Sequence, residues 1–270
     1  MNNGDFRKFR DLIYQESGIA LSDDKVPLLK GRIAKRLRVL GLSDERDYLR
    51  YITDAEHAEE VVQLIDAVST NVTFFYREPK HFEFFALLLK RWEEERKKSI
   101  RIWCAAASSG EEPYTLSIVC RETLGESPID ARILATDIST KVLKKAAQGE
   151  YRDEQFRETP SWIQRKYFKK IGENGSACWS VAPEIRDAVL FRRLNLSKFP
   201  YPLRGSLDAI FCRNVMIYFS REMRQRVIGE LERLLVPGGY LFLSHSENLL
   251  GINTRLETVK VSVYRKPLCS

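Results

Sequence analysis

Two adjacent glutamates directly follow a turn of small residues, and their position indicates a ligand that carries positive charge. The segment from Ile100 to Thr115 reads I-R-I-W-C-A-A-A-S-S-G-E-E-P-Y-T. It predicts a strand, a tight turn and a helix start, the place where α/β sheets hold nucleotide-like ligands. Glu111 and Glu112 would repel a phosphate, which is best bound by bare N–H groups without nearby negative charge. They suit an ammonium or a sulfonium, such as that of S-adenosylmethionine.

The turn itself is a weak signal. Gly110 is its only glycine, and Ala106 stands where many nucleotide-binding turns have one. An ordinary strand-to-helix turn fits the same residues, because short motifs often mislead. The small residues still allow a ligand to approach the backbone closely. Pro113 is expected at the first helical position, where its missing N–H has no cost.

Asp137 provides a second candidate ligand-binding group. It lies 27 residues after Gly110, at the end of the next predicted strand. In doubly wound folds, an acid at this place binds the ribose hydroxyls of an adenosine. The alternative is a structural role, because either Asp137 or Ser139 could cap the helix that follows.

A polar pair follows a third predicted strand in the run F-C-R-N-V-M-I-Y-F, residues 211–219. This places Arg213 and Asn214 at the carboxyl edge of the sheet, where ligands bind, and Tyr218 follows within one turn. Asn214 could instead satisfy only turn backbone groups, and Tyr218 could be a core residue with its hydroxyl at the surface.

A fourth polar cluster precedes the sheet, in S-T-N-V-T-F-F-Y-R-E at residues 69–78. Thr73 and Arg77 adjoin an aromatic run there. The aromatic run by itself is more typical of a core, and Arg77 next to Glu78 could form only a solvated ion pair.

The elements that must position these residues change character along the chain. Up to about residue 90 the apolar spacing is helical, as in Phe6, Phe9 and Ile13. From Ile100 onward strands and helices alternate, which predicts a parallel sheet covered by helices and a last strand at 259–264. Residues 151–196 interrupt this alternation and are expected to form an inserted antiparallel element. We therefore expect an α/β protein with a helical domain at 1–90 and a sheet domain at 91–270.

The composition excludes several classes of protein. The chain has 270 residues, a formal charge of +7, and five cysteines. None of the cysteines has C-x-x-C spacing, so they indicate reduced cytosolic thiols. No apolar run is long enough to span a bilayer. His57, His81 and His245 are isolated in the sequence, so we expect no metal site.

The four clusters together resemble the CheR-type chemotaxis receptor methyltransferases. The matching runs are N-V-T-F-F-Y-R-E, W-C-A-A-A-S-S-G-E-E-P-Y-T, A-T-D-I-S, R-N-V-M-I-Y-F and P-G-G-Y-L-F-L-S-H-S-E. They occur in the family's order and cover essentially the whole chain. The departures are Ala106 in place of a common glycine and Ala107 in place of a common cysteine, and they bear on cofactor affinity.

The resemblance implies an all-helical N-terminal domain, then a class I (Rossmann-like) methyltransferase domain with a small inserted β-subdomain. It implies methyl transfer from S-adenosylmethionine to glutamate side chains of chemoreceptors, with S-adenosylhomocysteine as the second product. The cofactor contacts that it carries over are Asn71, Thr73, Arg77, Ala106, Glu112, Asp137, Asn195, Leu196, Arg213 and Asn214.

The chemistry of this reaction explains why no catalytic base is evident. A glutamate carboxylate is already ionised at neutral pH, so it can attack a methyl group directly. We expect Arg77 and Tyr218 to border the reacting methyl, as catalytic residues that orient carboxylate and substrate oxygens. A basic stripe on the second predicted helix could dock an acidic receptor or could be a solvated face. Its members are Arg32, Lys35, Arg36 and Arg38.

Three other functions compete with this interpretation. A nicotinamide dehydrogenase would use Asp137 similarly, but the glycine triplet is missing and two acids stand where a pyrophosphate would bind. A nucleic-acid methyltransferase would explain the positive charge, but no Asn-Pro-Pro-aromatic motif for a flipped base occurs. The third alternative, a family member that binds receptors without catalysing methyl transfer, stays open.

The expected partner is the cytoplasmic helical bundle of a chemoreceptor, with a receptor tail peptide as a possible second contact on the β-subdomain. We expect a cytoplasmic monomer that meets membranes only through the receptor and does not bind nucleic acid.

Overall fold

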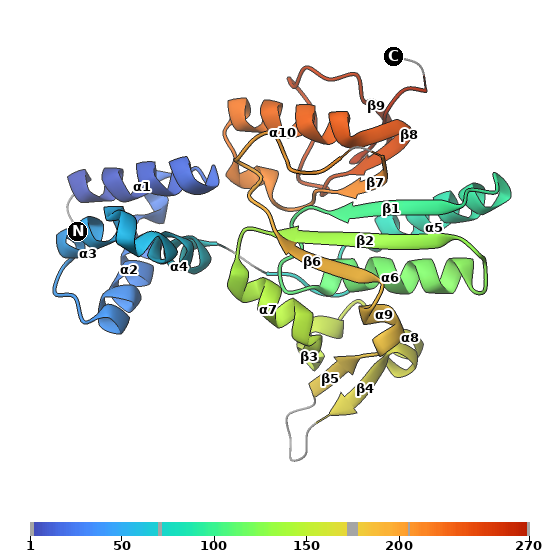
Figure 1. Cartoon of the computed structure of the whole chain (residues 1–270), viewed down its shortest axis with the longest axis horizontal. Helices are drawn as coiled ribbons and strands as arrows, with labels where there is room; N and C mark the ends of the chain where they lie inside the picture. Colours follow the sequence, from blue (N-terminus) through green and yellow to red (C-terminus); the bar gives the residue numbers. More distant parts are fainter. Residues whose placement is uncertain (1–2, 70–71, 172–177, 205, 269–270) are drawn as a thin grey trace.

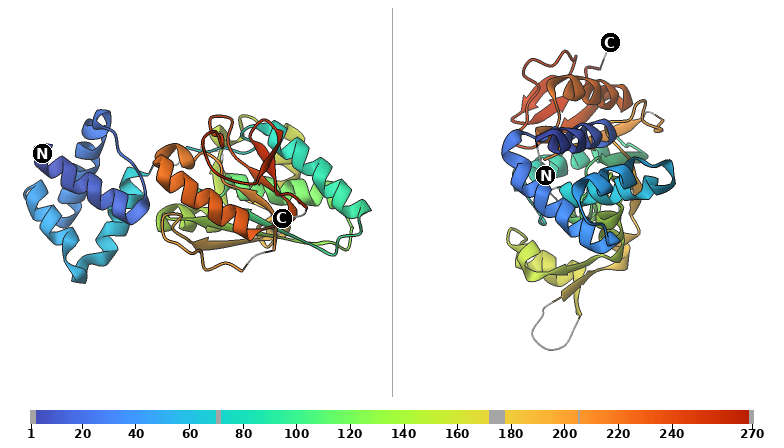
Figure 2. Two further views of the ribbon diagram at one scale, coloured as in Figure 1. Left: turned by 90° about the horizontal axis from the view of Figure 1, so that it is seen from above. Right: turned by 90° about the vertical axis from the view of Figure 1, so that its left-hand side faces the viewer.

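The computed structural model describes residues 3–69, 72–171, 178–204 and 206–268. Figure 1 shows a bundle of helices from the first quarter of the chain beside a larger part built on a sheet. The views in Figure 2 show the same two parts from above and from the end that carries the helices.

The helical part buries one apolar stripe from each of its helices. Phe9, Ile13, Leu29 and Ile33 lie together in its core. Gly41 ends the second helix in a left-handed conformation, with φ of 68°. The elements are α1 (Asn3–Ser17), η1 (Asp23–Lys25), α2 (Val26–Leu40), α3 (Glu45–Thr53), η2 (Ala55–His57) and α4 (Ala58–Val68).

Seven strands of the described chain form the main sheet, in the order β6-β2-β1-β7-β8-β10-β9. In this order, neighbouring strands from β6 through β8 run parallel to each other, whereas β10 is antiparallel to both β8 and β9. The bounds are β1 (Ser99–Cys104), β2 (Asp130–Asp137), β6 (Val189–Arg193), β7 (Leu207–Phe211), β8 (Leu235–Phe242), β9 (Glu257–Lys260) and β10 (Val263–Arg265).

The expectation of a parallel sheet with one last strand at 259–264 is corrected at the C-terminal end of the sheet. Ser262 adopts a left-handed conformation with φ of 59°, and this turn splits the segment into the two antiparallel strands β9 and β10. Strand β8 starts at Leu235 and includes Pro237 and the two glycines that follow. Proline is tolerated there because it lies where the register between β7 and β8 shifts, between the Leu235 and Tyr240 pairings.

Helices cover both faces of the sheet, and side chains of β1 alternate between the two cores. Ile102 and Cys104 join one core with α5 (Pro79–Glu94) and α6 (Glu111–Leu124). Trp103 joins the other core with α10 (Arg221–Leu234). Because α5 packs in the sheet core, residues that precede the expected boundary at residue 90 fold with the sheet.

The insertion follows α7 (Thr140–Gln148) and contains a second, antiparallel sheet in the order β3-β5-β4. The insertion ends earlier than the expected residue 196, because β6 (Val189–Arg193) pairs in parallel with β2 at the edge of the main sheet. The remaining elements are β3 (Glu150–Arg152), η3 (Asp153–Phe156), α8 (Ser161–Tyr167), β4 (Phe168–Ile171), β5 (Cys178–Val181), α9 (Pro183–Arg186) and η4 (Met216–Tyr218).

None of the helices in the described chain combines the length and the apolar character that crossing a bilayer requires.

Candidate active site

A cavity of about 320 Å³ lies between the helical part and the carboxyl edge of the main sheet. Doubly wound folds bind ligands at this edge. Asn71, which the sequence also predicts there, lies outside the described residues. The predicted site residues that line the cavity are Thr73, Arg77, Ala106, Glu112, Asp137, Asn195, Leu196, Arg213, Asn214 and Tyr218.

The two adjacent glutamates separate in the structure. Glu112 lines the cavity, but Glu111 is fully buried behind the turn, where it accepts hydrogen bonds from Ser109 Oγ and Gln155 Nε2. Burial raises the pKa of Glu111. Helix α6 begins at Glu111, so Pro113 occupies its third position and not the first, as was expected. Of the two glutamates expected to face a cationic ligand, Glu112 is therefore a cavity residue and Glu111 is a structural residue.

Gly110 is required by the shape of this turn. Its φ is +99°, and a Cβ atom there would lie 2.6 Å from Tyr151 Oη and 2.9 Å from Ala146 Cβ. The turn passes this closely because the Tyr151 hydroxyl donates a hydrogen bond to the Ser109 carbonyl, at 2.7 Å.

Gly110→Ala is expected to lower the free energy of unfolding by about 2–3 kcal/mol, because it adds both backbone strain and overpacking. Gly229→Ala in α10 is the matched control, since an added Cβ meets nothing within 4 Å. The control should stabilise the protein by about 0.5–1 kcal/mol. Urea denaturation followed by circular dichroism measures both, and a Gly110→Ala variant as stable as the wild type would contradict the argument.

Asp137 is held in place by the turn that it faces. Its Oδ2 accepts from the Ser108 backbone N–H and its Oδ1 from the Ser139 N–H, each at 2.9 Å. Ser139 caps α7 by accepting from the Val142 N–H, so the capping role left open by the sequence belongs to Ser139. Burial raises the pKa of Asp137. Each carboxylate oxygen retains a lone pair with which it can accept a ribose hydroxyl.

Arg213 lines the cavity and also forms a buried ion-pair network. Its NH1 lies 2.6 Å from Glu112 Oε2 and its NH2 lies 3.2 Å from Glu78 Oε2. The NH2 also donates to the Arg77 carbonyl. With a side chain that is only 1% exposed, Arg213 joins three segments that are far apart in the sequence.

Arg77 remains available at the cavity. Its NH1 donates to the Val72 carbonyl at 3.0 Å, and its guanidinium lies 5.8 Å from the centre of the Phe74 ring. The alternative of a solvated ion pair between Arg77 and Glu78 is wrong, because Glu78 pairs with Arg213 instead.

Glu247 is a structural residue of the site that the sequence analysis missed. Its carboxylate accepts hydrogen bonds from the backbone N–H groups of Asn214, Val215 and Met216, at 2.8–3.0 Å. It thereby holds the loop in which Asn214 takes a left-handed φ of 58° and which leads to Tyr218. The run S-H-S-E offered a weak signal, an acid after a buried strand.

The helical part also contributes to the cavity, which the sequence analysis did not anticipate. The Ala20 N–H donates to the Tyr218 carbonyl at 2.8 Å, and Asn195 Nδ2 donates to the Glu16 carbonyl at 2.6 Å. These bonds place the segment after α1 over the site. The cavity residues from the helical part are Ser17, Ile19, Ala20, Leu21, Ser22, Lys25, Leu28, Val68 and Ser69.

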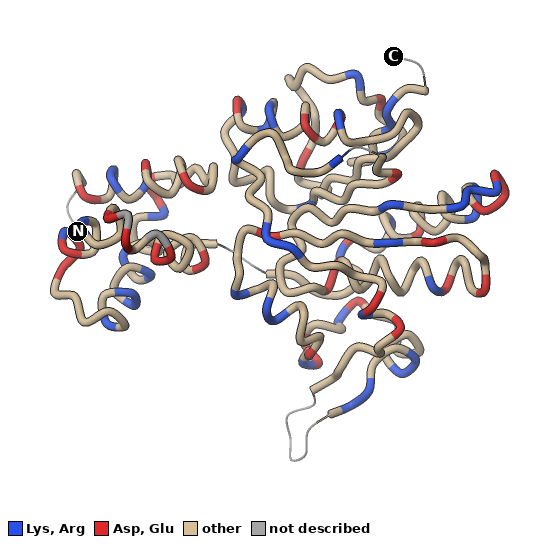
Figure 3. Tube along the Cα trace, viewed as in Figure 1, with Lys and Arg blue, Asp and Glu red and all other residues tan. Residues whose placement is uncertain are grey.

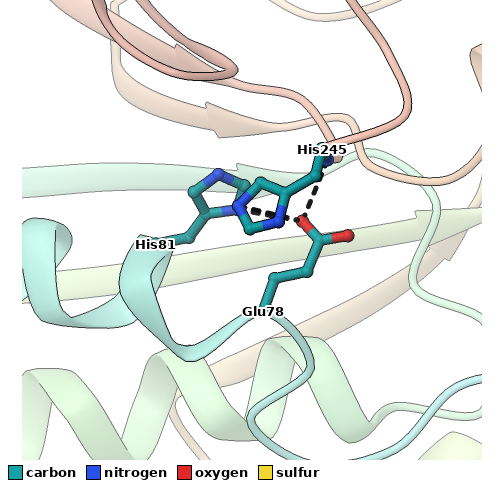
Figure 4. Close-up of side chains that lie close together, drawn as sticks. All are labelled: Glu78, His81 and His245. Atoms are coloured by element: carbon teal, nitrogen blue, oxygen red, sulfur yellow. Dashed lines mark hydrogen bonds and ion pairs between the residues drawn. The ribbon is translucent and has the colours of Figure 1, made fainter.

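His81 and His245, which are isolated in the sequence, lie side by side in the structure. Their ring centres lie 4.9 Å apart, and Figure 4 shows both rings beside Glu78. His81 Nδ1 lies 3.4 Å from Glu78 Oε2, and the His245 backbone N–H donates to the same oxygen at 3.2 Å. Burial lowers the pKa of His81 to about 4.

The basic stripe on α2 is only partly a free surface. Arg32, Lys35 and Arg38 are exposed, and Figure 3 shows the cluster of positive residues along this helix. Arg36 instead forms a two-pronged ion pair with Glu60, at 2.8 and 2.6 Å, and Tyr48 donates to the same carboxylate. Arg36 is therefore part of the packing of the helical domain, which leaves Arg32, Lys35 and Arg38 as the exposed members of the stripe.

A cavity at the carboxyl edge of a doubly wound sheet, with Asp137 after the second strand and Glu112 at the first helix start, defines a class I S-adenosylmethionine-dependent methyltransferase. Comparison with known families agrees. The model for the CheR methyltransferase SAM-binding domain matches residues 71–265, and the model for the CheR methyltransferase all-alpha domain matches residues 4–69. The chain belongs to the CheR methyltransferase family.

Similar curated proteins support this membership along the whole chain. The chemotaxis protein methyltransferase of Escherichia coli is 38% identical, over 98% of this chain and 91% of its own length. Chemotaxis protein methyltransferase 2 of Pseudomonas aeruginosa is 38% identical over 96% and 92%, respectively. The Klebsiella aerogenes chemotaxis protein methyltransferase is 39% identical over 94% and 86%. The cofactor is S-adenosylmethionine.

Proposed function

We propose that this enzyme transfers the methyl group of S-adenosylmethionine to glutamate side chains of the cytoplasmic domain of chemoreceptors. The products are glutamate methyl esters and S-adenosylhomocysteine. The observation that carries the proposal is one cavity that contains the cofactor-type acids Glu112 and Asp137 together with Arg77 and Tyr218. The chemotaxis methyltransferases similar to this chain support the choice of substrate.

The residues present fit the cofactor. The buried Asp137 carboxylate suits ribose hydroxyls, and Glu112 faces the cavity where a cationic methionine end would need an acid. When bound, S-adenosylmethionine supplies an electrophilic methyl group on a sulfonium.

The protein's own contribution to catalysis is positioning and the exclusion of water. The acceptor carboxylate is ionised at neutral pH, so no side chain has to remove a proton. Arg77 orients a carboxylate, and the Tyr218 hydroxyl directs a substrate oxygen. The segment after α1 covers the cavity, which removes water from the nucleophile. Good positioning alone contributes about 7–11 kcal/mol in favourable cases.

The test is transfer of radiolabelled methyl groups from S-adenosylmethionine onto receptor-containing membranes. A glutamate methyl ester releases its label as methanol in mild base, whereas a methylated nitrogen retains it. Base-labile label on the receptor supports the proposal. Receptor binding without label would identify a non-catalytic binding protein, and base-stable label would identify a different acceptor.

The exposed cations of α2 are proposed to dock the acidic receptor bundle. Arg32→Glu with Lys35→Glu should raise the KM for receptor about tenfold or more at low salt, and should leave the Kd for S-adenosylhomocysteine unchanged. Lys90→Glu with Lys98→Glu is the control, because it makes the same change in charge at exposed positions on or next to α5. An equal rise in KM for both variants would indicate a general charge effect and reject a specific docking surface.

The inserted subdomain is proposed to bind a receptor tail peptide. Within the described residues, β4 pairs on one side only, with β5, which leaves an edge that could add a peptide strand. The enzyme would act as a cytoplasmic monomer and reach the membrane only through its receptor. We further propose a domain boundary near residue 70, since α5 packs with the sheet.

A further inference from the structure

The ion pair between Glu112 and Arg213 raises a problem of charge. Glu112 faces the cavity, where the methionine end of the cofactor carries an ammonium, but its Oε2 lies 2.6 Å from a guanidinium. A carboxylate that is neutralised by an adjacent arginine attracts a second cation only weakly. Glu112 and Arg213 alone would therefore make a poor cation site.

Glu78 changes this charge balance. Its Oε2 lies 3.2 Å from Arg213 NH2, whereas Glu112 contacts the other terminal nitrogen, NH1. The three side chains have relative exposures of 16%, 1% and 13% for Glu78, Arg213 and Glu112, so water screens them little. Two carboxylates around one guanidinium leave a net charge of −1 beside the cavity.

We propose that Glu78 is a positioning residue for the cofactor: it shares Arg213 with Glu112, so that Glu112 is held in one orientation and the group retains one negative charge for the cofactor's ammonium. Glu78 does not line the cavity, so it acts through Arg213. The inference rests on the proposed placement of the methionine end near Glu112. It does not depend on which substrate accepts the methyl group.

The surroundings of Glu78 are built to hold its carboxylate in place. The residue has a left-handed φ of 60° directly before α5, a conformation that persists only where neighbouring structure imposes it. The His245 backbone N–H and the buried His81 ring approach the same carboxylate oxygen (Figure 4). His81 is neutral at neutral pH, because burial lowers its pKa to about 4, so it does not cancel the charge of Glu78.

The test compares two ligands that differ only at the methionine end. S-adenosylhomocysteine has the ammonium, whereas 5′-methylthioadenosine lacks the whole amino acid group. Glu78→Gln, which keeps the shape and removes the charge, should weaken the binding of S-adenosylhomocysteine about tenfold in calorimetry. It should change the binding of 5′-methylthioadenosine by less than about twofold. A loosened structure would weaken both ligands alike, and that result would overturn the proposal.

Two further variants separate this inference from its premise. Glu122→Gln is the matched control, because Glu122 pairs with Lys166 and Tyr167 away from the cavity, and both ligands should bind it as they bind the wild type. Glu112→Gln should show the same selective loss as Glu78→Gln. If only Glu112→Gln shows it, the role of Glu78 is wrong while the placement of the cofactor stands. If neither shows it, the placement itself is wrong.

The same three side chains, Glu78, His81 and His245, offer potential metal-ligand atoms within 4.8 Å of one another. The arginine beside Glu78 opposes a cation there. Dialysis of the wild type against a chelator should therefore leave the binding of S-adenosylhomocysteine unchanged. Loss of binding that added Zn²⁺ restores would make the cluster a metal site and overturn the positioning role.

Discussion

Arg213→Met is expected to lower the free energy of unfolding by about 3–5 kcal/mol, because it leaves two poorly solvated carboxylates without their shared partner. Glu78 and Glu112 both contact this guanidinium, which is 1% exposed. The same change should abolish measurable binding of S-adenosylhomocysteine, since three segments that form the cavity lose their common anchor. Urea denaturation and calorimetry measure the two effects.

Arg255→Met is the control for a generic loss of an ion pair. Arg255 contacts Glu232 at 2.8 Å, but its side chain is 62% exposed. Its loss should cost less than about 1 kcal/mol, because the Arg255 guanidinium is largely in water and Glu232 keeps its hydrogen bonds from Thr254 Oγ1 and from the Arg255 backbone N–H. Combining Arg213→Met with Glu78→Gln should recover part of the stability, since one unpaired charge is removed. No recovery in the double variant would contradict a mainly electrostatic cause.

Tyr218→Phe and Arg77→Ala are each expected to lower kcat about 10²-fold, the usual effect of losing one group that orients reacting atoms. Tyr218 lines the cavity through a loop fixed by Glu247 and by the Ala20 N–H. Tyr218→Phe should leave the Kd for S-adenosylhomocysteine nearly unchanged, because the hydroxyl is proposed to contact the substrate. Single-turnover methyl transfer to receptor membranes separates the chemical step from binding.

Tyr14→Phe tests whether the loss of any hydroxyl near this loop has the same effect. The Tyr14 hydroxyl lies 3.1 Å from Ser220 Oγ, two residues beyond Tyr218, at the contact between the two parts of the protein. Its removal should change kcat by less than about threefold, since it weakens only one exposed hydrogen bond. If both Tyr218→Phe and Arg77→Ala retained wild-type turnover, the proposed catalytic roles would be wrong.

Local pattern was sufficient for most of the fold. The helical spacing of Phe6, Phe9 and Ile13 predicted a helix of the N-terminal core, and the segment that begins at Ile100 predicted the central strand. The pattern was misleading near the end of the expected insertion at 151–196, because a short run such as Val189–Arg193 does not show which sheet it joins. That strand became β6 only through its pairing with β2.

Charged residues were the least predictable part of the site. Arg36 lay on a basic helix, but its partner Glu60 is 24 residues away in the sequence. Glu78 was next to Arg77, but it pairs with Arg213, which lies 135 residues further along the chain. Neither partner is local, so no spacing rule could have identified it.

By itself, the sequence predicted the cofactor and many of the residues at the sheet edge that line the cavity, because the polar residues after successive strands must meet at one edge of a parallel sheet. Only the tertiary structure decided what each charge does there. It buried Glu111, joined Glu112 to Glu78 through Arg213, and placed the segment after α1 over Tyr218. The physical reason is that the environment of a charge depends on burial and on contacts between distant segments, which only the folded chain creates.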